Sequence, residues 1–379
     1  MKACALWLLI LLGTVPCFAA DPHAADKAEV LRLLAEKRYV DLDAYVTEAA
    51  KHQPPFYGEG DSRLSKIYRH LSELDDKSPN RVWEEHIGKV EEWSAQFSSS
   101  VVPQIVLGST WVNYAWKARG GDWASAVGKS SWKLFGERLA KARQILESAE
   151  KLPGKDPELY NALLWVAIGQ GWSRPEMEAA FNKGIRINPN YFFLYETKAR
   201  YLLPRWHGKP GDWERFATQA ADARGGEDGD LLYLVIACSQ AWTEDEQLFR
   251  NTDISYQRMQ RGWEASLRRS WRKETATNCY ARYACFANDR PTAKRLFQSL
   301  GPAWDPDAWE DRQTFVRWKN WALGNGVRTV SKPAALPEGG SGDLLSKLLS
   351  VGYLGWALGG LIVGLLLFAI HKGCTSRTS

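Results

Sequence analysis

Cysteine is scarce in the part of the chain that we expect to be exported, and this scarcity excludes a fold built on disulfides. Of six cysteines, Cys4 and Cys17 fall in a predicted signal peptide and Cys374 follows the last hydrophobic segment. The other three are Cys238, Cys279 and Cys285. Three thiols cannot form a disulfide framework. Either Cys238 pairs with one of the other two, or all three stay free.

Charge of one sign, ligand-spaced histidines and β-strand alternation are also lacking. Lysine and arginine number 49 against 44 acidic residues, and the two signs are interleaved, so the sequence predicts no nucleic-acid-binding face. The histidines show no H-x-x-x-H spacing and no C-x-x-C pair accompanies them, so we expect no metal and no cofactor. His86 lies on an apolar helical face with Val82 and Val90, which favours a hydrogen-bonded core histidine over a ligand.

One long hydrophobic run stands near the end of the chain. Residues 351–370 carry no charged side chain, and His371, Lys372 and Arg377 follow them. Because ~20 helical residues span the ~30 Å hydrocarbon core of a bilayer, this run predicts a transmembrane helix. G-x-x-x-G pairs within it favour packing against a partner helix, a homo-oligomer included. Their residues are Gly355, Gly359, Gly360 and Gly364.

Residues 1–20 combine Lys2, an apolar centre and a small-residue end, which is typical of a secretory signal. The basic flank of the last segment then stays inside, so the positive-inside rule puts the domain between them outside the cytoplasm. We expect a signal peptide at 1–20, an ectodomain at 21–330, a linker and membrane approach at 331–350, a transmembrane helix at 351–370 and a cytoplasmic tail at 371–379. The predicted location is the bacterial inner membrane, with the ectodomain in the periplasm or outside the cell.

Helical periodicity dominates the predicted ectodomain. The spacing of apolar residues predicts two short helices near 30–34 and 42–46, a third over 82–97 and a longer one over 135–149. Asp156 before Pro157 predicts a helix start, because aspartate caps a helix and proline suits its first turn. Nineteen tryptophans, most of them spread between Trp83 and Trp321, are expected to fill gaps between packed helices.

A weak internal repeat appears in the second half of the chain. Segments 175–189 and 291–306 each open on a proline, carry a phenylalanine six residues later (Phe181 and Phe297) and close on a proline. An aromatic-rich helical segment precedes each of them, at 160–170 and 280–287. The pattern predicts an all-α fold, an irregular tetratricopeptide-like stack of helical hairpins (an α-solenoid), joined to the C-terminal transmembrane helix.

Two loops are the richest candidates for a binding site, since both combine arginine, glycine, aspartate and tryptophan. Such loops can present a cation and an aromatic plane to an anionic or sugar ligand. The alternative is structural, with Arg119 and Arg205 binding carbonyls at helix ends beside left-handed glycines. The candidate ligand-binding residues are Arg119, Asp122, Trp123, Arg205, Trp206, His207 and Asp212.

Four pieces of the chain form a recognisable pattern: 33–42, FYGEGDSRL at 56–64, NYAWKARG at 113–120 and 188–208, which ends in LLPRWHG. Over roughly residues 30–240 they resemble a bacterial family of uncharacterised proteins, the domain of unknown function 4034. The resemblance implies a mostly helical, repeat-like domain, and it brings no activity, cofactor or catalytic residue. The last hydrophobic segment lies outside it.

These features favour a membrane-anchored helical-repeat scaffold that binds a protein or peptide, because helical stacks expose long surfaces and no catalytic constellation is present. The first alternative is a carbohydrate- or cell-wall-binding module, which needs several solvent-exposed tryptophans as stacking platforms. The second is a hydrolase, for which His207 and Asp212 are the one candidate pair. That pair must converge in a cleft to act.

Overall fold

The computed structural model describes residues 24–51, 63–121, 124–241, 244–270, 272–309 and 311–327. Within these ranges there are sixteen α-helices, one short 3-10 helix and no β-strand. The prediction of an all-α fold is therefore confirmed for the described part of the chain.

The helices follow one another with short connections. The first eight are α1 (Ala24–Ala35), α2 (Tyr39–Lys51), α3 (Arg63–Ser72), α4 (Asn80–Gln96), α5 (Val101–Arg119), α6 (Lys129–Ala149), α7 (Pro157–Gln170) and α8 (Arg174–Ile187). The others are α9 (Phe192–Tyr201), α10 (Asp212–Arg224), α11 (Gly226–Ala241), the 3-10 helix η1 (Asp245–Gln247), α12 (Leu248–Asn251), α13 (Tyr256–Arg269), α14 (Lys273–Phe286), α15 (Arg290–Leu300) and α16 (Arg312–Leu323).

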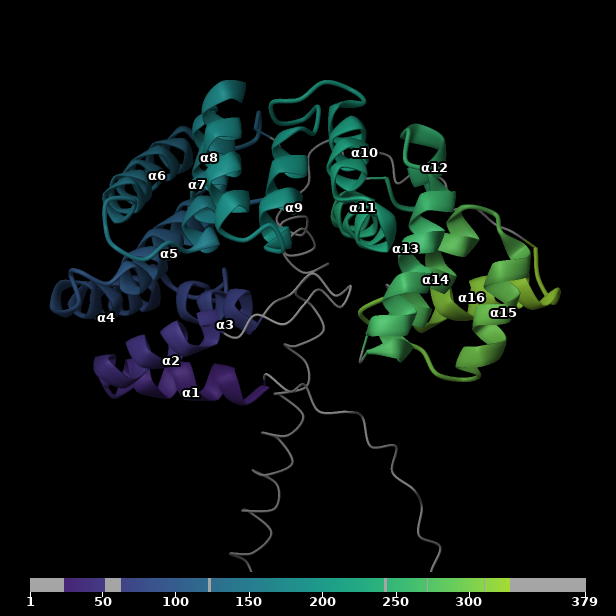
Figure 1. Cartoon of the computed structure of the whole chain (residues 1–379), viewed down its shortest axis with the longest axis horizontal. Coiled ribbons are helices and arrows are strands. Elements are labelled where there is room, and N and C mark those ends of the chain that lie inside the picture. Colours follow the sequence, from purple (N-terminus) through teal and green to yellow (C-terminus); the bar gives the residue numbers. More distant parts are fainter. Residues whose placement is uncertain are drawn as a thin grey trace, which may run out of the picture.

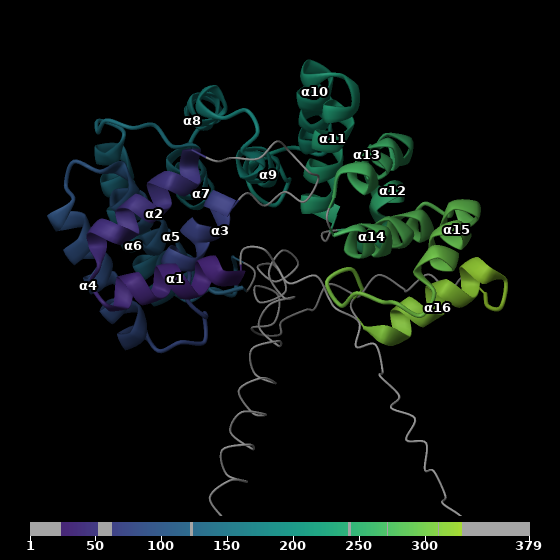
Figure 2. The same ribbon diagram turned by 60° about the horizontal axis from the view of Figure 1, so that its bottom comes forward.

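The described helices trace an arch (Figure 1). The chain rises from α1 at the lower left, crosses the top through α9, α10 and α11, and descends to α15 and α16 on the right. Figure 2 shows the same division, with α1 to α8 on one side and α12 to α16 on the other. Helices far apart in sequence therefore occupy opposite arms.

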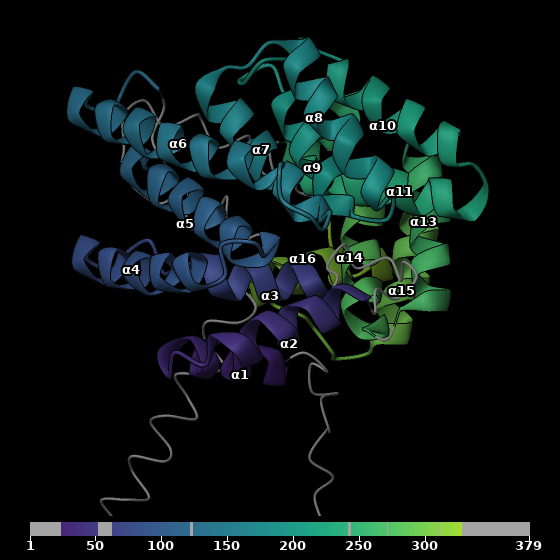
Figure 3. The same cartoon turned by 60° about the vertical axis from the view of Figure 1, so that its left-hand side comes forward.

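Packing joins helices that are close in sequence. Neighbours such as α5 and α6, α7 and α8, or α14 and α15 lie against each other, and Figure 3 shows α4, α5 and α6 side by side. Odd-numbered helices also contact one another in turn: α3 packs on α5, α5 on α7, α7 on α9, α9 on α11 and α11 on α13. Most buried side chains form one continuous core along the arch.

Local signals explain where several helices begin. The Asp156 carboxylate accepts a hydrogen bond from the Glu158 N–H at 2.9 Å and caps α7, as predicted. The two segments of the weak repeat begin α8 and α15, with Pro175 and Pro291 in their first turns. Phe181 and Phe297 are both buried, so the repeat marks two helices that fill the core in the same way.

The third predicted helix is present as α4, but its buried face is rotated from the predicted one. The buried side chains are those of Trp83, Ile87, Val90 and Trp93, whereas Val82 is only half-buried. The reason is the size of the two indoles, since Trp83 stacks on Tyr114 at a centroid distance of 5.3 Å and turns that side of the helix inward. The prediction for His86 is confirmed, because its ring Nε2 lies 2.8 Å from the Leu71 carbonyl oxygen.

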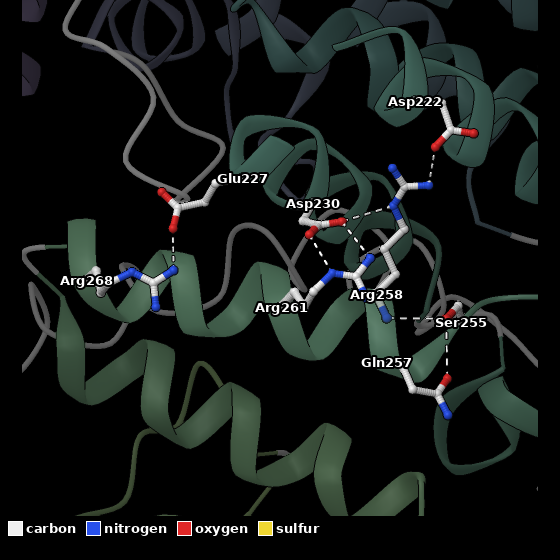
Figure 4. A network of polar contacts seen from close by, with 8 residues as sticks. All are labelled: Asp222, Glu227, Asp230, Ser255, Gln257, Arg258, Arg261 and Arg268. Atoms are coloured by element: carbon white, nitrogen blue, oxygen red, sulfur yellow. Dashed lines mark hydrogen bonds and ion pairs between the residues drawn. The ribbon is translucent and has the colours of Figure 1, made fainter. Parts of the chain in front are cut away.

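An ion-pair ladder fastens α13 to α10 and α11 (Figure 4). Arg258 contacts Asp222 at 2.6 Å and Asp230 at 3.2 Å, and Arg261 contacts the other Asp230 oxygen at 2.7 Å. Further along, Arg268 pairs with Glu227. The ladder is solvated on most of its length, so it orients α13 more than it stabilises the fold.

In the described part of the chain, no helix combines the length and the apolar character that crossing a membrane requires. The predicted signal at 1–20, linker at 331–350, transmembrane helix at 351–370 and tail at 371–379 all lie outside the described residues. The same holds for the glycine pairs of Gly355, Gly359, Gly360 and Gly364.

Candidate functional site

The structure brings the two candidate loops together. Arg119 ends α5, and its guanidinium carbon lies 5.5 Å from the ring centre of Trp206, which follows α9. The residues Asp122 and Trp123 of the first loop lie outside the described ranges. Two loops with similar composition therefore meet at one place, although more than eighty positions separate them.

Four tryptophans and two arginines form this meeting point, which we call the arginine–tryptophan cluster. Its members are Trp116, Arg119, Trp132, Trp165, Arg200 and Trp206. Trp116 is central, with its ring edge-on to Trp165 at 5.8 Å and to Trp206 at 5.5 Å. Arg200 lies over the Trp165 ring at 5.2 Å. Helices α5, α6, α7 and α9 each supply part of the cluster.

Arg119 occupies the middle of three indole faces. Its guanidinium lies 5.8 Å from Trp116 and 5.5 Å from both Trp132 and Trp206. It also donates to the Gly120 carbonyl oxygen at 3.0 Å, while Gly120 has a φ of +72°. The structural interpretation of Arg119 is thus supported, because the side chain binds a carbonyl at the helix end, and the same side chain gives the cluster its charge.

Arg205 adds a third cation nearby. Desolvation first, and then the positive charges of Arg200 and Arg119, lower the pKa of Arg205 to about 10, with Glu244 opposing them. Part of the Arg205 side chain nevertheless remains in solvent. The three guanidiniums thus bring positive charge to one part of the surface.

The outer edge of the cluster is apolar. Among the described tryptophans Trp132 alone is exposed, at 38%. Trp165 and Trp206 are half-buried and Trp116 is buried. A sugar-binding surface built on several exposed indoles is therefore not present in the described residues, whereas one exposed anchor beside cations is typical of protein interfaces.

His207 and Asp212 have different partners, although only a short loop separates them. The His207 ring nitrogen Nε2 lies 2.8 Å from the Ile168 carbonyl oxygen of α7, and the ring packs on Tyr201 with centroids 4.7 Å apart. Asp212 instead begins α10 and accepts from the Lys209 N–H at 3.0 Å. Each side chain thus holds the loop in place, and the pair gives no support to a hydrolase.

Asp212 also belongs to an open pocket of about 200 Å³ between α8, α9 and α10. The residues that line it are Arg174, Glu178, Lys198, Asp212, Arg215, Phe216 and Gln219. Arg215 and Arg174 both pair with Asp212. Desolvation raises the pKa of Asp212. The hydrogen bond from the Lys209 N–H and the positive charges of Arg215 and Arg174 outweigh that effect, so the pKa lies below its usual value. The sequence singled out Asp212 alone, and the i,i+4 pair of Arg174 and Glu178 was the one local signal for the rest.

A second group of titratable side chains lies largely inside the protein, with Tyr68, Asp156 and Tyr191 buried and Glu158 half-buried. Tyr191 donates to Glu158 at 2.5 Å, and Tyr68 donates to Asp156 at 2.7 Å. Burial raises the pKa of Glu158 to about 7, while the hydrogen bonds from Tyr191 and Asn161 oppose that rise. These phenol–carboxylate pairs join α3, α7 and the segment before α9, so they serve the packing of the arch.

The structure also shows the state of the cysteines and the distribution of side chains that could bind a metal. Cys238, Cys279 and Cys285 are free thiols, which is the second of the two alternatives left open by the sequence. In the described ranges, no three histidine, cysteine, aspartate or glutamate side chains gather closely enough to hold a metal ion.

No protein-family model matches the chain, and neither a curated protein nor a solved structure is similar to it. The resemblance to the uncharacterised bacterial family therefore stays a prediction, and the function rests on the geometry above.

Proposed function

We propose that this protein is a membrane-anchored scaffold that binds an acidic segment of a protein partner through the arginine–tryptophan cluster. In this proposal the described helices form an irregular tetratricopeptide-like stack. The transmembrane helix at 351–370 holds that stack on the outer face of the bacterial inner membrane, in the periplasm or outside the cell. The ectodomain acts by binding and carries out no reaction of its own.

The packing pattern supports the stack. Consecutive helices pair, and alternate helices from α3 to α13 contact one another in turn, as in repeat proteins where each unit touches only its neighbours. The two repeat segments provide equivalent helices, α8 and α15, each with a buried phenylalanine. Such stacks offer extended surfaces to a partner chain.

The observation that carries the proposal is the convergence of the two loops around one exposed indole. Trp132 is accessible, and the guanidinium of Arg119 lies 5.5 Å from the Trp132 ring. Tryptophan and arginine are the residues that most often dominate binding energy at protein interfaces. With Arg200 and Arg205 nearby, the surface suits a segment that carries carboxylates and one apolar side chain.

The test is photo-crosslinking of the full-length, tagged protein in intact cells, with a crosslinking amino acid beside Trp132. We expect a defined protein adduct that Trp132→Ser weakens at least ~10-fold, because removing an interface tryptophan commonly costs 2 kcal/mol or more. Val316→Ser is the matched control, since Val316 is similarly exposed at 43% but lies on α16. Fractionation of the same cells shows whether the adduct is in the membrane.

Three results bear against the proposal in different ways. An adduct unchanged by Trp132→Ser removes the cluster as the binding surface. Equal loss in Val316→Ser shows a general effect on folding. Recovery of cell-wall fragments in place of a protein establishes the carbohydrate-binding alternative.

A further inference from the structure

A buried ammonium group faces the pocket between α8, α9 and α10. The Lys198 side chain is only 8% exposed, and its Nζ atom lies 4.1 Å from the centre of the Phe181 ring and 4.5 Å from that of Phe216. Its anionic partner is the Glu178 carboxylate. An ammonium has three N–H donors, and aromatic faces satisfy such donors only weakly. Burial lowers the pKa of Lys198, although Glu178 opposes this effect.

Two arginines stand at the mouth of the same pocket. Arg174 reaches Glu178 at 3.2 Å and Asp212 at 3.5 Å, so one guanidinium is divided between two carboxylates. Arg215 contacts Asp212 and keeps 62% of its side chain in solvent. The lining thus has three cations and two carboxylates, which leaves one positive charge in excess.

We propose that this pocket binds a carboxylate, carried either by a small organic acid or by an acidic side chain of a peptide. One carboxylate would neutralise the single excess positive charge. The cations of the pocket already bind two carboxylates, those of Glu178 and Asp212. A doubly charged anion such as phosphate would leave the occupied pocket with a net negative charge, next to the carboxylates of Glu178 and Asp212, and is therefore disfavoured. The volume of about 200 Å³ corresponds to ~7 waters in the liquid, which suits a small ligand or one side chain.

The site is independent of the proposed partner surface. The arginine–tryptophan cluster is built from α5, α6, α7, α9 and the loop at 202–211, whereas α8, α9 and α10 line the pocket, with α8 and α10 on either side of α9 (Figure 1). No residue belongs to both. A change in the pocket is therefore expected to leave the Trp132 crosslink intact, and loss of that crosslink says nothing about the pocket.

Isothermal titration of the full-length protein in detergent tests the proposal. The probes are sodium acetate, inorganic phosphate and an end-blocked pentapeptide with one central glutamate. We expect acetate or the peptide to bind with a Kd of ~1 mM, which is ~4 kcal/mol of binding free energy. Arg215→Gln is expected to raise that Kd ~5- to 10-fold, because a charge-assisted hydrogen bond is lost.

Arg261→Gln is the matched control. The Arg261 side chain is 57% exposed against 62% for Arg215, and each arginine pairs with an aspartate that is 14% exposed. Lys198→Met removes the buried ammonium between Phe181 and Phe216 and is expected to disturb the packing of both rings, so Arg215→Gln carries the test.

Each result of the titration either supports or overturns the proposed carboxylate site. Acetate binding that Arg215→Gln weakens and Arg261→Gln preserves supports a small-acid site, whereas binding of the peptide alone supports a peptide side chain as the source. Absence of heat with every probe up to ~10 mM, well above the expected Kd, overturns the proposal. Phosphate that binds more tightly than acetate, or equal weakening by both variants, also overturns it.

Discussion

The contact between α11 and α13 provides the sharpest test of the fold. Gly262 is buried in α13, and a Cβ atom added there would lie 2.6 Å from the carbonyl oxygen of Asp230 and 2.8 Å from the Leu234 Cβ. Both of these atoms belong to α11 or its backbone, so neither can move aside as the tip of a flexible side chain can. Gly262→Ala must therefore push the two helices apart.

Two opposing terms set the size of the effect. Alanine in place of glycine within a helix favours folding by ~1 kcal/mol. Overpacking a tight contact costs ~1–3 kcal/mol. The helix shift also disturbs the Asp230 carboxylate, which holds Arg258 and Arg261 (Figure 4). We expect a net loss of up to ~2 kcal/mol for Gly262→Ala, because the overpacking cost exceeds the gain in helix propensity.

Gly88→Ala is the matched control. Gly88 lies inside α4, is exposed and has no atom within 4 Å of an added Cβ. Only the propensity term remains there, so this variant is expected to be more stable than wild type by up to ~1 kcal/mol.

Thermal unfolding of the full chain, followed by tryptophan fluorescence and circular dichroism, measures both variants. The melting temperature is expected to fall for Gly262→Ala and to rise for Gly88→Ala, by ~2 °C per kcal/mol for a chain of this size. A rise in both variants would refute the close approach of α13 to α11. A fall in both would refute the reasoning from helix propensity.

Two further predictions concern buried titratable groups. Burial raises the pKa of Glu158 and of Glu73 to about 7, from 4.5, so the folded state holds their protons more tightly and stability falls as the pH rises from about 4.5 to 7. Glu158→Gln should make denaturant-unfolding stability fall less over that range, and an unchanged slope contradicts this. Burial also raises the pKa of Cys279 to about 12 and that of Cys238 further. Both thiols should resist iodoacetamide at pH 8 until the protein is denatured, and a disulfide-linked peptide in the mass spectrum would contradict the free-thiol assignment.

Sequence alone determined where many helices lie and how they begin. The Asp156–Pro157 pair, the prolines at 175 and 291, and the apolar stripe of α6 all act within one or two helical turns. Caps and periodicity are local, so neighbouring residues suffice to predict them. The core role of His86 followed in the same way from its place on an apolar face.

Only the tertiary structure decided what the helices bring together. It places Arg119 against Trp206, gives His207 and Asp212 separate partners, and buries Lys198 between two phenylalanines from other helices. These neighbours come from helices whose mutual orientation depends on close packing, including the fit of two large indoles in α4. No local pattern encodes such contacts, because the side chains that meet belong to segments tens of residues apart.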